Sequence, residues 1–214
     1  MSRLIASFIH NNNAIDDLPN LSVELINKLI DEYSKELEAD YPYVLSQYRA
    51  YLWILHRSID SEQLTFSDIA AIHWCMYKYI DNDAGMLRED FKKIRDYECP
   101  NPNIMSFYIK KLNSLLSIID DVKNTSEEEL NGYLWYVHNV FQCIQPFKFG
   151  NGRVGRFLFN SLRMKCGISI SEWNVDKYFY FNAIKKFEKT FEERYSPAIG
   201  SDGLGESELR VQRG

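Results

Sequence analysis

Apolar residues recur every three or four positions along most of this chain, and this spacing constrains its fold more than any other feature. The clearest stripe is Leu21, Leu25, Leu29, Tyr33 and Leu37. Side chains at this spacing share one face of a helix, so the stripe predicts a helix with one buried side. With 214 residues, 45% of them hydrophobic, the chain can build one sizeable core. The pattern therefore predicts an all-α fold.

Residues that start or stop helices separate the stripes. Asn20 or Ser22 could cap the first helix, and Pro42 interrupts it. Thr65, with Asp68 three residues later, predicts a capping box. The other expected elements are helices over 48–59, 65–80, 103–122, 125–144, 153–167 and 175–195, with irregular chain or a small hairpin over 86–99.

The chain divides into four parts. We expect an N-terminal helical region over 1–64, a core over 65–168, and a C-terminal helix over 169–196 that packs on the core. Residues 197–214 hold four of the ten glycines and few apolar residues. This composition predicts a disordered tail.

Charge and composition exclude several classes of protein. The 25 basic and 30 acidic side chains give a net charge of -5, which removes the simple electrostatic case for binding nucleic acid. No apolar run approaches the roughly 20 residues of a membrane span, and no signal-peptide core with a cleavage site is present. The four cysteines lack CxxC spacing and predict reduced thiols. We expect a cytoplasmic protein, or an effector delivered without a cleaved signal peptide; its oligomeric state stays open.

The stretch from Gln145 to Arg156, Gln-Pro-Phe-Lys-Phe-Gly-Asn-Gly-Arg-Val-Gly-Arg, is the most informative. Its Gly-Asn-Gly loop lets backbone N–H groups converge at the start of the next helix, where anions bind. Arg153 and Arg156 lie on one helical face near that end, and guanidinium groups make forked contacts with phosphate. The predicted phosphate-binding residues are Gly150, Asn151, Gly152, Arg153 and Arg156. The alternative is a glycine-rich turn followed by solvated arginines.

This stretch resembles the signature of the Fic (Fido) family, His-Pro-Phe-x-Asp/Glu-Gly-Asn-Gly-Arg-x-x-Arg. His138 and Ile144 fall where family members often carry a His and an Ile, and Gly85 and Arg88 resemble the Gly-x-x-Arg that precedes the family's target-docking hairpin. The resemblance covers residues 65–168, which we therefore expect to be a Fic core. The positions that match within the motif are Pro146, Phe147, Gly150, Asn151, Gly152, Arg153 and Arg156.

The resemblance implies a Fic-like helical bundle with one small β-hairpin, the flap. Most active members transfer AMP, or another phosphate-containing group, from a nucleotide to a hydroxyl of a target protein. It thus implies ATP or another nucleotide as ligand, and as partner a protein with an extended segment that adds to the flap as a strand. The flap residues expected to dock the target are Phe91, Lys92, Lys93 and Ile94.

Two positions depart from the family pattern. Gln145 stands in place of the motif His, and an amide cannot act as a general base near neutral pH, a role worth about 10²–10⁴ in rate. Phe149 stands in place of the acid and offers no oxygen to Mg²⁺, so Mg²⁺ is not expected at the usual position. His138 lies seven residues upstream of Gln145, about two turns away, and is expected to be structural.

A third departure concerns the N-terminus. Residues 7–12 resemble the inhibitory helix of many members, Ser/Thr-x-x-x-Glu-Gly/Asn, with Ser7 at its start and Asn11 where the Glu would be. In the family that Glu pairs with the second Arg of the motif, so this relic implies that Arg156 has lost its charged partner. The alternative is a frayed terminus.

Three hypotheses follow. The leading one is a degenerate Fic protein, a pseudo-AMPylase that binds a nucleotide or another phosphate ligand, or acts through its flap. The second is a transferase of nucleotidyl or phosphoryl groups to protein hydroxyls with altered, His-independent chemistry, in which Gln145 orients the nucleophile. The third is a non-enzymatic interaction scaffold whose pocket is empty or filled by Phe149.

Overall fold

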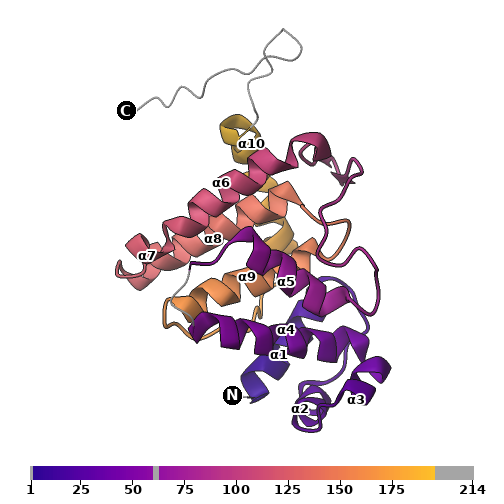
Figure 1. The fold of residues 1–214 in the computed structure, drawn as a ribbon. Coiled ribbons are helices and arrows are strands. Elements are labelled where there is room, and N and C mark those ends of the chain that lie inside the picture. Colours follow the sequence, from indigo (N-terminus) through magenta and orange to yellow (C-terminus); the bar gives the residue numbers. More distant parts are fainter. Residues whose placement is uncertain (1, 60–62, 196–214) are drawn as a thin grey trace.

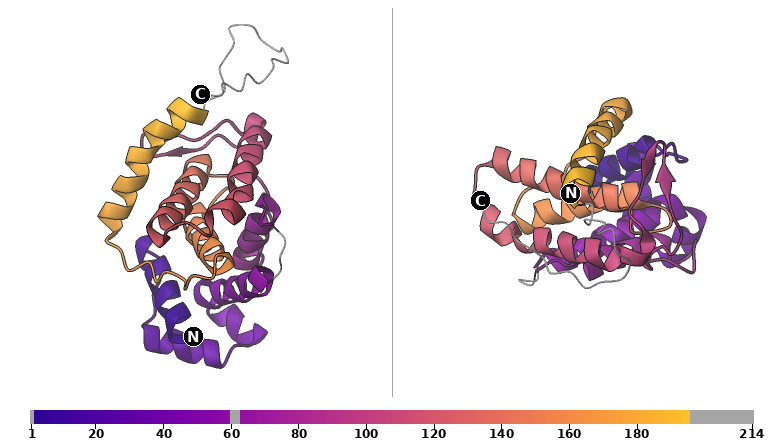
Figure 2. Two further views of the ribbon diagram at one scale, coloured as in Figure 1. Left: turned by 90° about the vertical axis from the view of Figure 1, so that its left-hand side faces the viewer. Right: turned by 90° about the horizontal axis from the view of Figure 1, so that it is seen from above.

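Two long helices, α8 (Glu127–Ile144) and α9 (Asn151–Lys165), form the centre of the structure, and the other helices surround them (Figures 1 and 2). This computed structural model describes residues 2–59 and 63–195. Most of the apolar side chains of α8 and α9 are fully buried, because each helix is covered on several sides. The residues of the predicted tail, 197–214, lie outside the described part of the chain.

The described chain is mostly helical, and its one sheet is a pair of two-residue strands, which confirms the all-α class with one small hairpin. Residues 103–122, predicted as one helix, form three successive pieces. The remaining elements are α1 (Ser2–Ile15), α2 (Val23–Asp31), α3 (Lys35–Asp40), α4 (Pro42–Ile59), α5 (Phe66–Tyr77), β1 (Lys93–Ile94), β2 (Tyr97–Glu98), η1 (Pro102–Ile104), α6 (Met105–Ser117), α7 (Ile119–Val122) and α10 (Lys177–Tyr195).

The first apolar stripe is two helices rather than one. Ser22 caps α2, since its hydroxyl accepts the N–H of Leu25 at 3.2 Å. Ser34 caps α3 in the same way, accepting the N–H of Leu37 at 3.1 Å, so the chain leaves the helix and starts again. Pro42 begins α4 instead of breaking a helix, because proline needs no N–H partner in a first turn.

The capping box predicted at Thr65 is present, and a second box begins α8. Thr65 and Asp68 form a reciprocal capping box at α5, in which the Thr65 N–H donates to the Asp68 carboxylate at 2.6 Å. Ser126 and Glu129 form the same box at α8. Helix α5 ends at Tyr77, three residues before the predicted end. The capping residues thus marked helix starts better than the apolar stripes marked helix ends.

The hairpin lies within the segment predicted as irregular chain or a hairpin. Strands β1 and β2 are antiparallel, with Lys93 opposite Glu98 and Ile94 opposite Tyr97. Arg95, at the turn, has a left-handed backbone with φ of 54°. This hairpin is the flap, and the left view of Figure 2 shows it beside α10.

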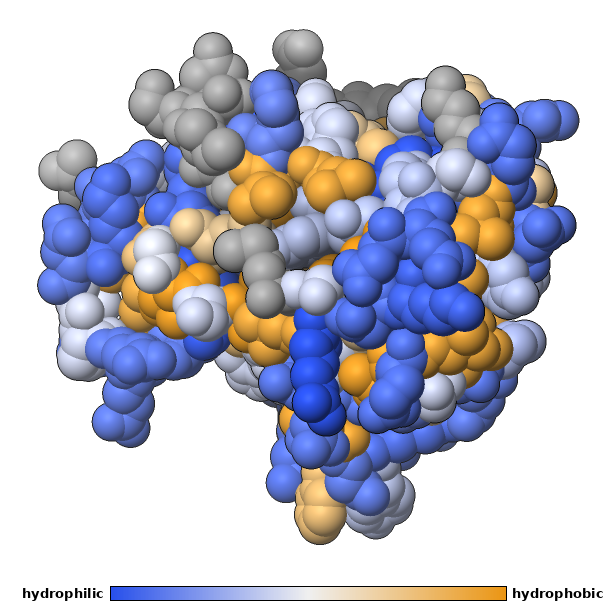
Figure 3. All heavy atoms as spheres, turned by 90° about the horizontal axis from the view of Figure 1, so that it is seen from below, coloured by the Kyte–Doolittle hydropathy of each residue, from blue (hydrophilic) through white to orange (hydrophobic). Residues whose placement is uncertain are grey.

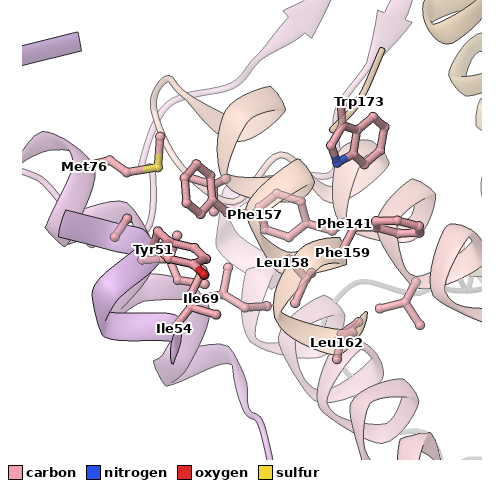
Figure 4. Packing of buried hydrophobic residues seen from close by; sticks show 14 of the residues in the cluster. Tyr51, Ile54, Ile69, Met76, Phe141, Phe157, Leu158, Phe159, Leu162 and Trp173 are labelled. Atoms are coloured by element: carbon pink, nitrogen blue, oxygen red, sulfur yellow. The ribbon is translucent and has the colours of Figure 1, made fainter. Parts of the chain in front are cut away.

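The core joins the N-terminal helices to the centre. In Figure 4, Ile54 of α4 and Ile69 of α5 face Leu158 of α9, and all three side chains are buried. The face seen in Figure 3 is mostly hydrophilic, with apolar side chains in separate groups. None of the described helices has the length and apolar character needed to cross a bilayer. All four cysteines are free thiols, as predicted.

Candidate functional site

The segment between α8 and α9, residues 145–150, is the motif loop, and its path is set by hydrogen bonds to the backbone. Gln145 ends α8 in a left-handed conformation with φ of 49°. Its carbonyl accepts Nε–H of the buried Arg88 at 2.8 Å, and the Arg88 N–H donates to Pro146 O at 2.9 Å. Gln145 Nε2 donates to Gln142 O at 2.8 Å, which orients the side-chain amide.

Asn151 closes the motif loop with its side chain. The Asn151 amide accepts the N–H of Phe147 at 2.9 Å and donates to the Phe147 carbonyl at 2.7 Å. Both polar atoms of this predicted phosphate-binding side chain are therefore used to hold the loop. The part of Asn151 available to a ligand is its backbone N–H, at the first position of α9.

Gly150 lets the motif loop pass very close to an aromatic ring at the point where the chain begins α9. Its φ is +72°, and any Cβ at this position would overlap the ring and hydroxyl of Tyr77. As the cap of α9 it supplies no side chain to the first N–H groups of the helix. Those groups have no intrahelical acceptors, so this end of α9 attracts negative charge.

A cavity of about 220 Å³ lies in front of this helix end. It is bounded by the motif loop, the first turn of α9, the flap and α10. The lining residues are Asp16, Lys92, Ile94, Arg95, Tyr97, Gln142, Gln145, Gly150, Asn151, Gly152, Arg153, Phe181, Ile184 and Glu188. The structure thus brings four of the five predicted phosphate-binding residues and Gln145 to one cavity.

Arg153 is the cationic residue of α9 that lines the cavity. Its Nε lies 3.4 Å from Asp16 Oδ2, and its guanidinium stands 5.0 Å from the centre of the Tyr77 ring. The side chain is 10% exposed. A ligand in the cavity can therefore reach a cation whose position is set by a ring and a carboxylate.

Arg156, the fifth of the predicted phosphate-binding residues, is fully buried behind Arg153 and Asp16 and does not line the cavity. Its Nη2 donates to Asp16 Oδ1 at 2.8 Å, its Nε to Asn12 Oδ1, and its Nη1 to the Tyr180 hydroxyl at 3.2 Å. The expectation that Arg156 has lost its charged partner is wrong, because Asp16, just after α1, pairs with it.

The relic predicted at 7–12 lies on α1, which is a regular helix and not a frayed terminus. Asn11, predicted beside Arg156, instead donates to the Glu172 carbonyl at 2.8 Å. Asn12, one residue later, takes the place beside Arg156, and Ser7 is half-buried elsewhere on the helix. The prediction that Asn11 lies beside Arg156 is therefore wrong by one residue. Successive residues of a helix are turned by about 100°, so Asn11 faces residue 172 while Asn12 faces Arg156.

Phe149 packs on the far side of the motif loop from the cavity. Its ring lies 4.8 Å from that of Tyr77, edge to face, and 5.6 Å from that of His73. His73 Nε2 donates to the Phe149 carbonyl at 3.1 Å, and its Nδ1 accepts the Gly85 N–H at 2.8 Å. Phe149 is not among the residues that line the cavity. Burial lowers the pKa of His73 to about 4, so the ring is neutral.

The position of the motif acid does not fit a metal ion, because a phenyl ring packed against other rings offers no ligand oxygen. Among residues 2–59 and 63–195, no group of three or more His, Cys, Asp or Glu side chains could hold a metal. The carboxylates that line the cavity are Asp16 and Glu188. Burial raises the pKa of Glu188, and the nearby Arg95 opposes this.

His138 does not reach the cavity. The ring is fully buried, with Nδ1 2.9 Å from Gly155 O and Nε2 3.2 Å from the Tyr180 hydroxyl. Burial lowers its pKa to about 3. The contacts tie α8 to α9 and α10, the structural role predicted for it.

The flap forms one rim of the cavity. Ile94 lines the cavity, and the Lys92 ammonium donates to Lys148 O at 2.9 Å, which ties the flap to the motif loop. Phe91 is 74% exposed before β1. Lys93 faces outward, 3.7 Å from Glu98 on the paired strand.

Comparison with known proteins decides the family. The model of the Fic/DOC family matches residues 63–162, which span the capping box of α5, the flap and the motif. This segment is a Fic domain. "Protein adenylyltransferase Fic" of Drosophila persimilis is 25% identical over 158 residues, which cover 72% of this chain and 29% of that protein. The chain thus spans less than a third of the length of the curated relatives it matches.

Solved Fic structures share the fold. A Fic-domain signalling protein from Bacteroides thetaiotaomicron superposes with a TM-score of 0.67 at 20% identity, covering 88% of this chain and 73% of that one. The BepC effector of Bartonella tribocorum, solved with bound AMPPNP, has a TM-score of 0.59 at 15% identity, covering 72% and 82%. A Bartonella quintana Fic domain with bound ADP has a TM-score of 0.57 at 17% identity, covering 71% and 78%.

Sequence reasoning missed several residues of this site. Two of them, Asp16 and Tyr77, lie more than 60 positions before the motif, and the third, Arg95, lies at the turn of the flap. No motif in the sequence singled them out. Glu188 of α10 lies outside the matched Fic segment. The one available signal was the Asp16-Asp17 pair that follows an apolar helix beside a predicted anion site.

Proposed function

We propose that this protein is a degenerate Fic protein, a pseudo-AMPylase that binds ATP or a related nucleotide without transferring AMP efficiently. The observation that carries the proposal is the cavity in front of α9, where the uncapped helix end and Arg153 meet. The two nucleotide-bound Fic structures named above support the choice of ligand. The wider activity, targets and partners of the protein belong to this proposal.

The Asp16 carboxylate marks the place for a phosphate group. It pairs with both motif arginines, and a Cβ on Gly152 would lie 3.4 Å from its Oδ1, so it sits at the start of α9. A phosphate would meet the same cations and the same helix end. A nucleotide therefore competes with Asp16 for this position, and the protein keeps a carboxylate stand-in when no ligand is bound.

The residues around the cavity lack the chemistry of an efficient transferase. Gln145 lines the cavity at the position of the base, and its amide cannot take a proton from a hydroxyl. The acid that would hold Mg²⁺ is replaced by Phe149, whose ring packs away from the cavity. We therefore expect nucleotide binding that is insensitive to Mg²⁺.

The test is calorimetric titration of the full chain with ATP, with and without Mg²⁺. We expect micromolar binding that Mg²⁺ leaves unchanged and that Arg153→Ala abolishes. Arg163→Ala is the matched control, because Arg163 lies at the other end of α9, away from the cavity. Absence of ATP binding by the wild-type protein would leave the third hypothesis, a scaffold, in its place.

A second candidate is a transferase with altered chemistry, favoured by the carboxylate that α10 brings to the cavity. Glu188 lines the same cavity as Gln145, and its raised pKa suits a proton acceptor better than an ordinary surface carboxylate would. In this reading Gln145 orients the target hydroxyl, and the flap holds the target as an added strand.

Incubation with labelled ATP and candidate proteins separates the two functions. The proposed pseudo-AMPylase gives no label above background. Label transfer that disappears in both Gln145→Ala and Glu188→Gln would instead establish the transferase. Lys189→Ala, a neighbouring exposed position on α10, is the control for nonspecific effects of changes on that helix.

A further inference from the structure

The ion cluster at the start of α9 contains more hydrogen-bond donors than its one carboxylate can serve. Asp16 Oδ1 accepts from Arg156 at 2.8 Å, while Asp16 Oδ2 lies 3.4 Å from Arg153 Nε without hydrogen-bond alignment. Arg153 Nε is consequently buried with no hydrogen-bond partner among the described residues. A buried donor in this state is unfavourable unless an acceptor reaches it.

A second unpaired donor lies beneath the same cluster. The Tyr77 side chain is 1% exposed, and its hydroxyl has no hydrogen-bond partner in the described part of the chain. A Cβ on Gly150, the residue that caps α9, would overlap this hydroxyl, and the hydroxyl lies close enough to Asp16, Arg153 and Arg156 to feel their charges. The Arg153 guanidinium covers the ring of Tyr77 at 5.0 Å.

Packing alone does not require the Tyr77 hydroxyl. The ring contacts His73 at 4.6 Å and Phe149 at 4.8 Å between ring centres, and a phenyl ring could make both contacts. The hydroxyl is the one part of the side chain that gains nothing from these neighbours. Phe149, which stands where the family carries its acid, braces the ring edge to face and so keeps the hydroxyl beneath Gly150.

We propose that the Tyr77 hydroxyl, together with Arg153 Nε, binds the phosphate group that displaces Asp16. A tetrahedral phosphate presents more acceptor oxygens than a planar carboxylate, so it can satisfy Arg156 and the two unpaired donors at once. Tyr77 therefore selects phosphate over carboxylate at this site. The inference rests on the proposed nucleotide binding and assigns a phosphate-binding role to a residue outside the motif.

The test compares Tyr77→Phe with the wild-type protein, by calorimetric titration with ATP and separately with inorganic phosphate. We expect the variant to bind each about tenfold more weakly, the effect of one lost hydrogen bond to a charged group. Without ligand, we expect its thermal midpoint to be unchanged or higher, because the change removes a buried hydroxyl that had no partner. Tyr108→Phe is the matched control, since Tyr108 is an equally buried tyrosine of α6 whose ring packs on Phe107 and Phe191, not on the ion cluster at the start of α9.

The outcomes distinguish this inference from the proposed function. If the wild-type protein binds ATP and Tyr77→Phe binds it equally well, the role of Tyr77 is overturned while nucleotide binding stands. Binding of phosphate but not ATP by the wild-type protein overturns nucleotide binding, and the phosphate series then decides the role of Tyr77. Failure to bind either ligand overturns both. A lower thermal midpoint with unchanged affinity would show a purely structural hydroxyl.

Discussion

The motif loop has two sides that differ in chemistry. The side toward the cavity carries the helix end, Arg153 and Asp16, and it is polar and partly solvated. The side toward α5 is aromatic, with Phe147 fully buried and stacked on His73 at 4.1 Å, and Phe149 against Tyr77. Phe149, at the position of the motif acid, thus belongs to the packed side, while the helix end and Arg153 stay on the cavity side.

The largest expected effect is on the packed side. Phe147→Ala should lower the free energy of unfolding by about 3–5 kcal/mol, because it leaves a cavity between α5 and the loop. Phe91→Ala, at an exposed position of the flap segment, should change it by less than about 0.5 kcal/mol. Urea denaturation of both variants measures the difference, and equal effects would contradict the two-sided picture.

A second effect on the packed side depends on pH. The pKa of His73 is about 4 in the folded protein and near 6.5 when unfolded, so protonation favours unfolding. The contribution of neutral His73 to the free energy of unfolding is therefore fully present above about pH 6.5. It falls by about 2–3 kcal/mol as the pH drops to about 4.5. His73→Gln should remove this part of the slope in urea midpoints measured from pH 7 to 4.5. The part due to His138, whose pKa is lowered to about 3, should remain.

On the cavity side, the proposed function has a nucleotide compete with Asp16 for the two motif arginines. Asp16→Asn removes the charge that neutralises Arg153 and Arg156, so ATP affinity should rise about tenfold, or about 1.4 kcal/mol. Asp17→Asn is the matched control, because Asp17 is exposed and pairs with Lys177 instead. Titration calorimetry measures both variants. An affinity that falls in Asp16→Asn would mean that Asp16 holds the site together and does not occupy it.

The smallest expected effect is at the rim of the cavity. The Lys93–Glu98 pair on the flap is 3.7 Å long, with side chains 58% and 83% exposed. Lys93→Ala should therefore change stability by less than about 0.5 kcal/mol, since solvent screens such pairs. Thermal denaturation checks this, and a larger loss would place the flap among the packed parts of the molecule.

Local signals predicted part of this architecture well. The capping boxes at Thr65 and Ser126 mark helix starts in the structure, because their hydrogen bonds join residues only three apart. The break at Ser34 was missed, since Tyr33 and Leu37 continue the apolar spacing through it. An apolar stripe reports which residues are buried, and here two short helices bury them as well as one long helix would.

The motif and the family were readable from the sequence alone. Gly150 to Gly152 and Arg153 stand at spacings that act over one helical turn, so their meeting at the start of α9 follows from local geometry. Gln145 and Phe149, at the first and fifth positions of the motif, are likewise read directly from the sequence. On these two residues rests the proposal that the site lacks the base and the metal ligand of an efficient transferase.

Only the tertiary structure decided what meets Arg156 and what lies beneath the loop. Asp16 is 140 positions from Arg156, and Tyr77 is 73 positions from Gly150. Such contacts depend on how α1 and α5 pack on α9, and a shift of one residue along α1 would exchange Asn12 for Asn11. Burial then decides which donors remain unpaired, and that depends on every helix around the site.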